Sequence, residues 1–323
     1  MDSFKGEKVL VTGITGFIGG HLARSLIERG ARVHGISRRT DAPNLTSSIR
    51  KAIEIHPLDI RDGNGIARLL REEEYSYVFH LASQADTWQS IQQPYDTIQT
   101  NVMGTLNLLE AIRLAPHPPI SVFAGSVRVF HFSTHGGKAN YSEALHPYDA
   151  SKVAAEVIVA SYLHAYSLPG AVARNTNTYG GNDLNFSRLV PRIMKGIFTE
   201  KKIVLRGDGK VRRDFMYVED AVEGMLALAL RAPHLKRMEY TFASGENVSV
   251  GDIVEKALAL LPRNDITIEW QTEQPLQDRD QVTCDISVTQ KELGWRPTHS
   301  LTEGLKRTLQ WYENHFAHGG EKE

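Results

Sequence analysis

The segment VLVTGITGFIG, residues 9–19, constrains the fold of this chain more than any other part of it. A short apolar run that is typical of a buried strand ends at Gly13, and an amphipathic helical pattern begins at Phe17. The glycines suit a sharp turn at Gly13, a close approach of backbone to ligand at Gly16, and close packing of helix on strand at Gly19. The N-terminus of the helix offers free N–H groups to phosphates. The segment therefore predicts a dinucleotide-binding turn.

Short β-rich runs alternate with longer helical patterns through the first half of the chain. We expect strands at residues 8–12, 32–37, 53–55, 77–81, 120–124 and 171–174, and helices at 17–29, 94–114 and 148–166. Alternation at this spacing predicts an α/β fold with a doubly wound parallel sheet (Rossmann). Shorter helices and weak strands after about residue 180 predict a smaller C-terminal substrate-binding lobe. We place the dinucleotide-binding domain at 1–176 and the lobe, interleaved with it, mainly at 177–323.

Charge and cysteine content narrow the class of protein. The 323 residues include 37 Lys+Arg and 38 Asp+Glu, a net charge of −1, which gives no field that would collect nucleic acid or coat a membrane. The single cysteine, Cys284, excludes an internal disulfide and a Cys-rich metal site. The polar N-terminus is unlike a signal peptide, and no apolar run is long enough to span a bilayer. We expect a cytoplasmic protein without nucleic-acid or membrane partners.

A second motif, Tyr148-x-x-x-Lys152, lies at the start of a helical pattern. Residues four apart share one face of a helix, so the phenol and the ammonium group are neighbours. A free tyrosine, with a pKa of about 10, is a poor base near neutral pH. A nearby cation favours the phenolate, and the pair therefore indicates general acid–base chemistry.

The Gly-x-x-Gly-x-x-Gly turn and the Tyr-x-x-x-Lys pentad resemble the extended short-chain dehydrogenase/reductase family, in particular its NAD(P)-dependent nucleotide-sugar epimerases and dehydratases. The resemblance reaches the LGWRP segment at residues 293–297. It implies that Tyr148 takes a proton from a sugar hydroxyl, usually at C4, as nicotinamide accepts a hydride. Lys152 would orient the ribose and lower the pKa of Tyr148. The resemblance also implies a nucleotide-diphosphate-sugar substrate and a homodimer formed through the helices at 94–114 and 148–166.

The same resemblance assigns the other site residues. Ser126, in FAGSVRVF, matches the family's catalytic Ser or Thr, and Thr134 is an alternative that would need an insertion. The segment NVMGT at residues 101–105 matches the family's Asn-x-x-Gly-Thr. The expected cofactor-binding residues are Gly13, Gly16, Phe17, Ile18, Gly19, Ser37, Arg38, Asp59, Ile60, Leu81, Ala82, Tyr148 and Lys152. The expected substrate-binding residues are Ser83, Gln84, Ser126, Arg128, Asn177, Arg213 and Arg279.

The residues at the end of the second expected strand indicate whether the cofactor is NAD or NADP. An acid there holds the ribose 2′-hydroxyl of NAD, whereas an arginine suits the 2′-phosphate of NADP. This strand ends in Ser37 and Arg38, with no acid before Asp41, and it resembles the NADP-using GDP-mannose dehydratases. We expect NADP, with NAD as the alternative.

The residues after Ser126 bear on the reaction. The 4,6-dehydratases carry acids there, whereas this chain has Val127 and Arg128, neither of which can act as a carboxylate acid or base. This favours hydride transfer at C4, in an epimerase or a 4-keto-sugar reductase. A 4,6-dehydratase of the GDP-mannose or CDP-glucose type is the alternative. It is favoured by the segment 181–191, which resembles the CDP-glucose dehydratases, and Glu143 could supply the acid. A catalytically silent, cofactor-sensing protein is a third reading.

Histidines were the remaining candidates for metal binding. His131 and His135 are four residues apart but lie in a glycine-rich segment without a third ligand pattern. We expect no metal site.

Overall fold

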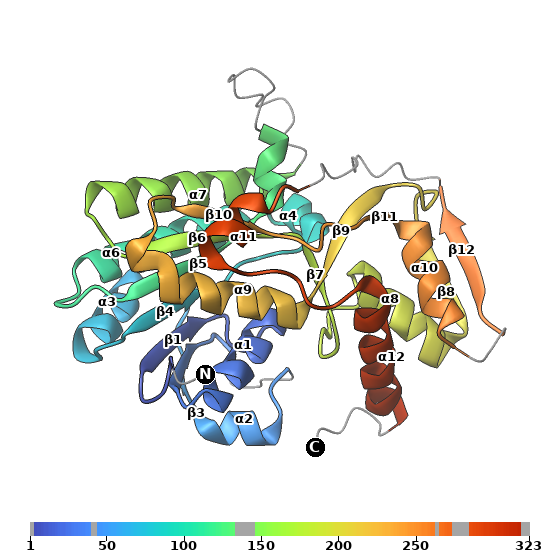
Figure 1. Ribbon diagram of the computed structural model, residues 1–323, viewed down its shortest axis with the longest axis horizontal. Coiled ribbons are helices and arrows are strands. Elements are labelled where there is room, and N and C mark those ends of the chain that lie inside the picture. The colour runs from blue at the N-terminus through green and yellow to red at the C-terminus, as the bar shows by residue number, and fades with distance from the viewer. Residues whose placement is uncertain (1–2, 40–43, 133–145, 262–264, 273–283, 318–323) are drawn as a thin grey trace.

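A seven-stranded parallel sheet forms the centre of the computed structural model, which describes residues 3–39, 44–132, 146–261, 265–272 and 284–317 (Figure 1). The strand order is β10-β6-β5-β4-β1-β2-β3. The doubly wound α/β fold is confirmed, and the six expected strands lie within two residues of their predicted ends. The six are β1 (Lys8–Thr12), β2 (Arg32–Ile36), β3 (Ile53–His56), β4 (Tyr77–His80), β5 (Ile120–Ser126) and β6 (Gly170–Asn175). The seventh strand, β10 (Glu239–Phe242), was not expected.

Helices cover both faces of this sheet because successive side chains of each strand point to opposite sides. Val9 and Val11 of β1 pack with α1 (Phe17–Glu28) and α9 (Val218–Arg231) on one face. Leu10 packs on the other face with α3 (Gly63–Glu72), α6 (Gly104–Arg113) and α7 (Pro147–Ala165). The remaining helices of this part are α2 (Ser47–Ala52), α4 (Thr87–Gln92), α11 (Ser287–Leu293) and the short 3-10 segments η2 (Val127–Phe132) and η5 (Ala232–His234).

The long helix expected at residues 94–114 is interrupted. It consists of α5 (Pro94–Ile98), the π-helical turn η1 (Gln99–Met103) and α6 (Gly104–Arg113). Such turns are often found at functional sites. This one carries Asn101, a polar side chain that is 2% exposed.

The smaller lobe has its own core, in which Tyr312, Ile193 and Leu305 are fully buried. It holds a three-stranded sheet, β11-β9-β7, and a two-stranded sheet, β12-β8. Its elements are β7 (Asn177–Tyr179), α8 (Leu189–Lys195), the π-helical turn η4 (Gly196–Glu200), β8 (Lys202–Arg206), β9 (Arg212–Tyr217), β11 (Asn247–Ser249), α10 (Val250–Ala259), β12 (Thr267–Gln271) and α12 (Leu301–Ala317). Both β10 and α9 come from the C-terminal half of the chain but pack with the central sheet. The boundary at residues 176/177 stays a prediction.

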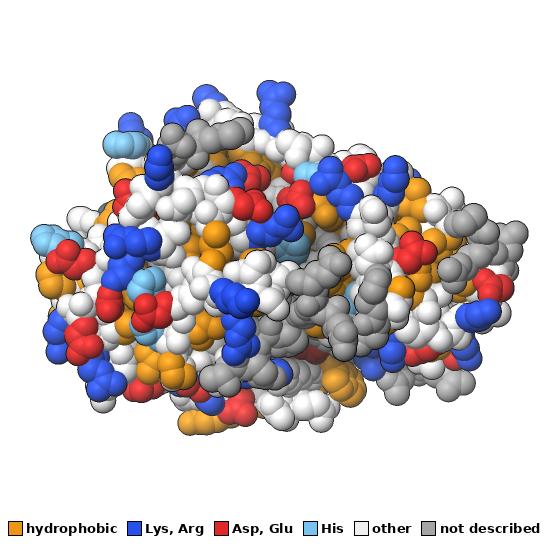
Figure 2. All heavy atoms as spheres, turned by 90° about the horizontal axis from the view of Figure 1, so that it is seen from below, with side chains coloured by type: hydrophobic (Ala, Val, Ile, Leu, Met, Phe, Trp, Pro, Cys, Tyr) orange, Lys and Arg blue, Asp and Glu red, His pale blue; other side chains and the backbone are white. Residues whose placement is uncertain are grey.

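The surface carries charges of both signs. Figure 2 shows basic and acidic side chains interspersed over the face seen from below. Among the described residues, no helix is both long and apolar enough to cross a membrane.

Candidate active site

The turn after β1 brings three elements together. Gly13 has a φ of +71°, and a Cβ atom there would lie 2.8 Å from the backbone nitrogen of Ala82, just after β4. A Cβ at Gly19 would collide with the carbonyl of Gly13, so α1 can approach the strand only with glycine at this position. Gly16 caps α1 without a side-chain hydrogen bond. The first N–H groups of α1 lie at this turn, where a helix N-terminus could bind a pyrophosphate.

The strand ends beside this turn hold charged groups. The Ser37 hydroxyl is buried, donates to the carbonyl of Arg39 (2.9 Å) and accepts from its N–H (3.1 Å). Arg38 is exposed. The side chain of Arg61 donates to Asp59 (Nε–Oδ2, 3.0 Å), and this bond, with the charge of Arg38, holds the pKa of Asp59 below its usual range. Arg61 was not among the residues predicted for the site.

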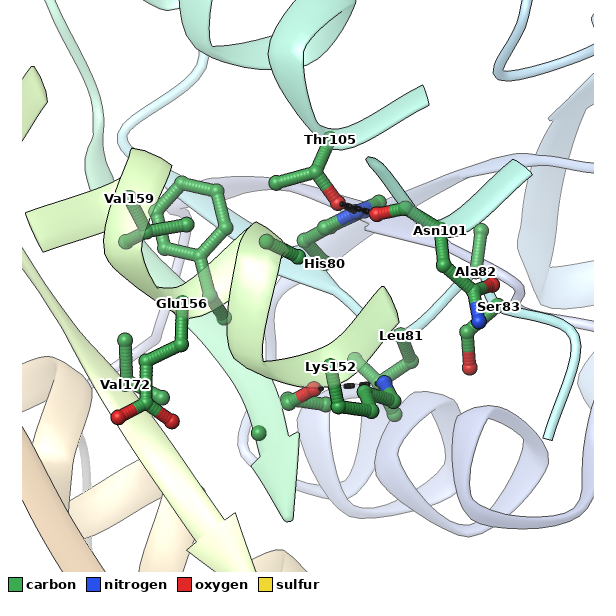
Figure 3. Close-up of a pocket in the computed structure, with 14 residues that line it drawn as sticks. His80, Leu81, Ala82, Ser83, Asn101, Thr105, Lys152, Glu156, Val159 and Val172 are labelled. Atoms are coloured by element: carbon green, nitrogen blue, oxygen red, sulfur yellow. Dashed lines mark hydrogen bonds between the residues drawn. The ribbon is translucent and has the colours of Figure 1, made fainter. Parts of the chain in front are cut away.

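A buried hydrogen-bond chain links the ends of β1 and β4 to the π-helical turn. Figure 3 shows its part from His80 through Thr105 to Asn101. His80 Nδ1 lies 2.7 Å from Thr12 Oγ1, and His80 Nε2 lies 2.9 Å from Thr105 Oγ1. The Thr105 hydroxyl donates to the carbonyl of Asn101 (2.7 Å), so it accepts from Nε2–H, and Nδ1 accepts from Thr12. Burial lowers the pKa of His80 to about 3. The ring is therefore neutral and held in one tautomer.

Asn101 extends this chain to the helix that carries the Tyr-Lys pair. Its side chain accepts from the N–H of Gln84 (2.7 Å) and donates to the Gln84 carbonyl (2.9 Å) and to Ser151 Oγ (2.8 Å). The Ser151 hydroxyl donates to the carbonyl of Tyr148 (2.7 Å). The loop after β4 and the first turn of α7 therefore share one anchor. The Asn-x-x-Gly-Thr motif contained this residue, but the sequence assigned it no role.

Tyr148 and Lys152 lie one turn apart at the start of α7, which begins at Pro147. Lys152 Nζ donates to the carbonyl of Ala124 (3.2 Å) and lies 6.0 Å from the centre of the Tyr148 ring. Burial lowers the pKa of Lys152 to about 8, and the charge of Glu156 opposes this shift. Lys152 lines a small pocket together with the ends of β4 and β5 and with Ala82 and Ser83, which follow β4 (Figure 3).

Burial and neighbouring charges act on the pKa of Tyr148 in opposite directions. Burial raises the pKa of Tyr148, and the largest opposing effect is the charge of Arg128, followed by a hydrogen bond with Ser126. Arg128 Nη1 lies 3.3 Å from Oδ1 of Asp149, whose side chain is 2% exposed. The N–H of Arg128 also donates to Ser126 Oγ (3.2 Å). The structure thus brings Ser126, Arg128, Tyr148 and Lys152 together, and it adds Asp149, which the sequence analysis missed.

On the substrate side, Asn177 and Arg213 lie on paired strands, β7 and β9. The Asn177 amide donates to the carbonyl of Asp214 (3.0 Å). The Asp214 carboxylate is buried and accepts from Thr176 Oγ1 (2.9 Å) and from the N–H groups of Ser244 (2.9 Å) and Gly245 (2.8 Å). These bonds join β9 to the end of β10. The other sequence candidates Arg279, Thr134, Glu143 and His135 lie outside the described residues.

Comparison with known proteins identifies the family. The family model described as GDP-mannose 4,6 dehydratase matches residues 10–308. The chain belongs to this family. The expected place among the extended short-chain dehydrogenase/reductase enzymes that modify nucleotide sugars is thereby confirmed.

Individual relatives include enzymes of two reaction types. The chain is 32% identical to dTDP-glucose 4,6-dehydratase of Xanthomonas campestris, over 94% of this chain and 92% of that protein. It is 29% identical to UDP-glucuronate 4-epimerase of Thermodesulfobacterium geofontis, over 94% and 95%. The solved dTDP-glucose 4,6-dehydratase of Bacillus anthracis, in complex with NAD, matches with a TM-score of 0.79 at 26% identity, covering 96% of this chain and 97% of that one. Because both reaction types occur among the relatives, the reaction has to be argued from the site itself.

Replacing Lys152 by methionine is expected to stabilise the protein at neutral pH. The pKa of Lys152 is about 8 in the folded chain against an ordinary value of 10.5, so between these values the unfolded chain binds more protons, and wild-type stability rises with pH. The variant lacks this rise. The difference between these pKa values corresponds to about 3 kcal/mol, and loss of the bond to Ala124 offsets about 1 kcal/mol of it. We therefore expect a gain of about 2 kcal/mol at pH 7 that disappears towards pH 10.5.

Urea unfolding of both proteins at pH 7 and pH 10 measures this difference. Lys51→Met, at an exposed position of α2, is the control and should change stability by less than about 0.5 kcal/mol at either pH. A loss of stability in Lys152→Met that is equal at both pH values would contradict the expectation.

Proposed function

We propose that the protein is an NAD(P)-dependent enzyme that transfers a hydride at C4 of a nucleotide-diphosphate sugar, as an epimerase or a 4-keto-sugar reductase. The observation that carries the proposal is the Arg128–Asp149 ion pair beside Ser126 and Tyr148. In the resemblance to the 4,6-dehydratases, Arg128 stands at a position where those enzymes carry an acid, and here it is paired with Asp149. Family membership and the NAD-bound relative support the cofactor and substrate class.

Each residue has its own role in the proposed reaction at C4. Tyr148, as phenolate, accepts the proton of the C4 hydroxyl, and Ser126 holds the sugar oxygen in line with the phenol. The permanent charge of Arg128 opposes the effect of burial on the pKa of Tyr148, and Lys152 lies one helical turn away to hold the ribose. A bound nicotinamide supplies the hydride acceptor. Return of the proton and hydride to the other face of the sugar gives the epimer, and the same residues in reverse reduce a keto sugar.

Elimination of water would need more than these groups supply. After oxidation at C4, a group must remove the C5 proton and another must protonate the departing C6 oxygen, and each positioned acid or base contributes about 10²–10⁴-fold. Val127 is apolar and 5% exposed, and Arg128 stays protonated. The carboxylate of Asp149 is engaged with Arg128. A 4,6-dehydratase remains the second candidate, favoured by the family model and by the Xanthomonas relative.

Incubation with UDP-, GDP-, CDP- and dTDP-hexoses in deuterium oxide, followed by mass spectrometry and NMR, separates these reactions. We expect either an isomer of unchanged carbon skeleton or reduction of a supplied 4-keto sugar, without loss of water and without rapid exchange at C5. Tyr148→Phe should lower the rate by at least about 10²-fold, whereas Tyr166→Phe, at the exposed end of the same helix region, should retain it. Rapid formation of a 4-keto-6-deoxy product would overturn the proposal and establish the dehydratase.

The charged groups at the strand ends support NADP as the preferred cofactor. Arg38 is exposed and follows Ser37, whose hydroxyl lies 2.9 Å from Thr15 Oγ1 of the glycine turn. The charge of Arg38 also lowers the pKa of Asp59. Charge-assisted bonds to a 2′-phosphate contribute about 1.5–3 kcal/mol. Arg38→Ala is therefore expected to weaken NADP binding by about tenfold or more and to leave NAD binding nearly unchanged.

Fluorescence titration of the cofactor-free protein with NADPH and NADH tests this preference. The exposed Arg68 of α3 provides the matched variant, Arg68→Ala, which should change neither affinity. Tighter binding of NADH by the wild type, or unchanged NADPH binding in Arg38→Ala, would show that the strand end does not select NADP.

Exposed apolar side chains support a homodimer through α5 and α7. Tyr95 of α5 is 73% exposed and Val157 of α7 is 63% exposed. Leu163, on the same helix, is 3% exposed and packs in the core, so α7 has one face for the sheet and another for a partner. In a twofold dimer each substitution occurs in both copies. We expect wild-type protein to be dimeric by light scattering at micromolar concentration and Val157→Glu to be monomeric.

The control is Ile268→Glu, in β12 and 40% exposed, which should remain dimeric. A monomeric wild-type protein would refute the proposed assembly without bearing on the reaction.

A further inference from the structure

A second cluster of polar side chains lies at the edge of the central sheet. His34 belongs to β2, and Glu54 and His56 belong to β3, the edge strand. Glu54 is directly opposite His34 in the strand register. Because Glu54 and His56 are two residues apart on one strand, all three side chains emerge from the same face of two neighbouring strands. The sequence places His34 about 20 residues from the other two, and no local motif connects them.

The ligand atoms of this cluster converge. His34 Nδ1 lies 3.2 Å from His56 Nε2, and the two carboxylate oxygens of Glu54 lie 3.8 Å from His34 Nδ1 and 3.7 Å from His56 Nε2. A tetrahedral zinc ion with bonds of about 2.0–2.2 Å holds its ligands roughly 3.3–3.5 Å apart. The observed separations are close to that arrangement, so small side-chain movements would place all three groups on one ion.

The burial and the hydrogen bonding of the three side chains also fit a metal site. The side chains of His34 and His56 are 13% and 18% exposed, whereas that of Glu54 is 62% exposed. Two imidazole nitrogens that face each other directly share a single proton at most, and the hydroxyl of Tyr75 also lies 3.3 Å from His34 Nδ1. A cation between the rings would use both lone pairs and the carboxylate.

We propose that His34, Glu54 and His56 bind one divalent transition-metal ion, best matched by zinc, that ties the edge strand β3 to β2. Imidazole and carboxylate ligands suit zinc, and water from the solvent beside Glu54 completes the coordination. The N–H of Ser37 donates to the carbonyl of His56 (3.2 Å). The ion would therefore fix the strand ends that carry Ser37 and Arg38. Its role is structural, and the proposal does not depend on the reaction proposed above.

The test uses the full-length protein after treatment with a chelator and removal of the chelator. Titration with zinc chloride by calorimetry should show one equivalent bound, and cobalt(II) should give the visible absorption bands of a low-symmetry site with nitrogen ligands. Zinc should also raise the melting temperature, because it binds the folded form. Glu54→Gln, a change at an exposed side chain, is expected to weaken zinc binding by about tenfold or more, and so is His56→Gln.

Two controls separate this site from other ligands. Glu72→Gln alters an exposed carboxylate of α3, and a double variant, His131→Gln with His135→Gln, removes the histidine pair noted in the sequence. Both should bind zinc as the wild type does. Unchanged zinc affinity in Glu54→Gln and in a folded His56→Gln protein, loss of binding in the double variant, or no stoichiometric binding by the wild type would each overturn the proposal and leave a hydrogen-bonded histidine pair.

Discussion

The buried hydrogen-bond chain from Thr12 through His80 and Thr105 to Asn101 fixes the geometry on which the site depends. Its members come from β1, β4 and the segment η1–α6, and Asn101 continues it to α7 through Ser151. Inside a protein an unpaired polar group costs about 1–3 kcal/mol, so a fully satisfied chain tolerates few alternative arrangements. The glycine turn after β1 and the helix that carries Tyr148 are therefore fixed in position relative to each other.

The central sheet could be predicted from the sequence because its strands are covered on both faces and are short apolar runs. Strand β1 was predicted without error, and α1 to within one residue. The interruption of the expected helix at η1 could not be predicted, because it accompanies the tertiary bonds of Asn101 to Gln84 and Ser151 rather than any local preference. The return of β10 to the central sheet also depends on long-range pairing, with β6, that no local pattern shows.

The same distinction between local patterns and long-range contacts explains which site residues could be predicted. Residues that belong to local motifs, such as the pair Tyr148 and Lys152, could be named because their spacing on one helix determines their proximity. Arg61 and Asp149 were missed because their importance arises from the partners Asp59 and Arg128. The cluster of His34, Glu54 and His56 could not be predicted, because His34 and Glu54 become neighbours only when the register of β2 and β3 is known.

Two cations of different character lie near Tyr148, and the difference bears on which chemistry the site suits. Lys152, with a pKa of about 8, loses part of its charge as the pH rises above neutral, whereas Arg128 keeps its charge at every working pH. A single proton transfer at C4 needs one base with a constant positive neighbour, which Arg128 provides. An elimination needs a second, free carboxylate, and the same arginine would bind that group as it binds Asp149. In the proposed reaction, the arginine that would favour the phenolate is thus the same group that argues against dehydration.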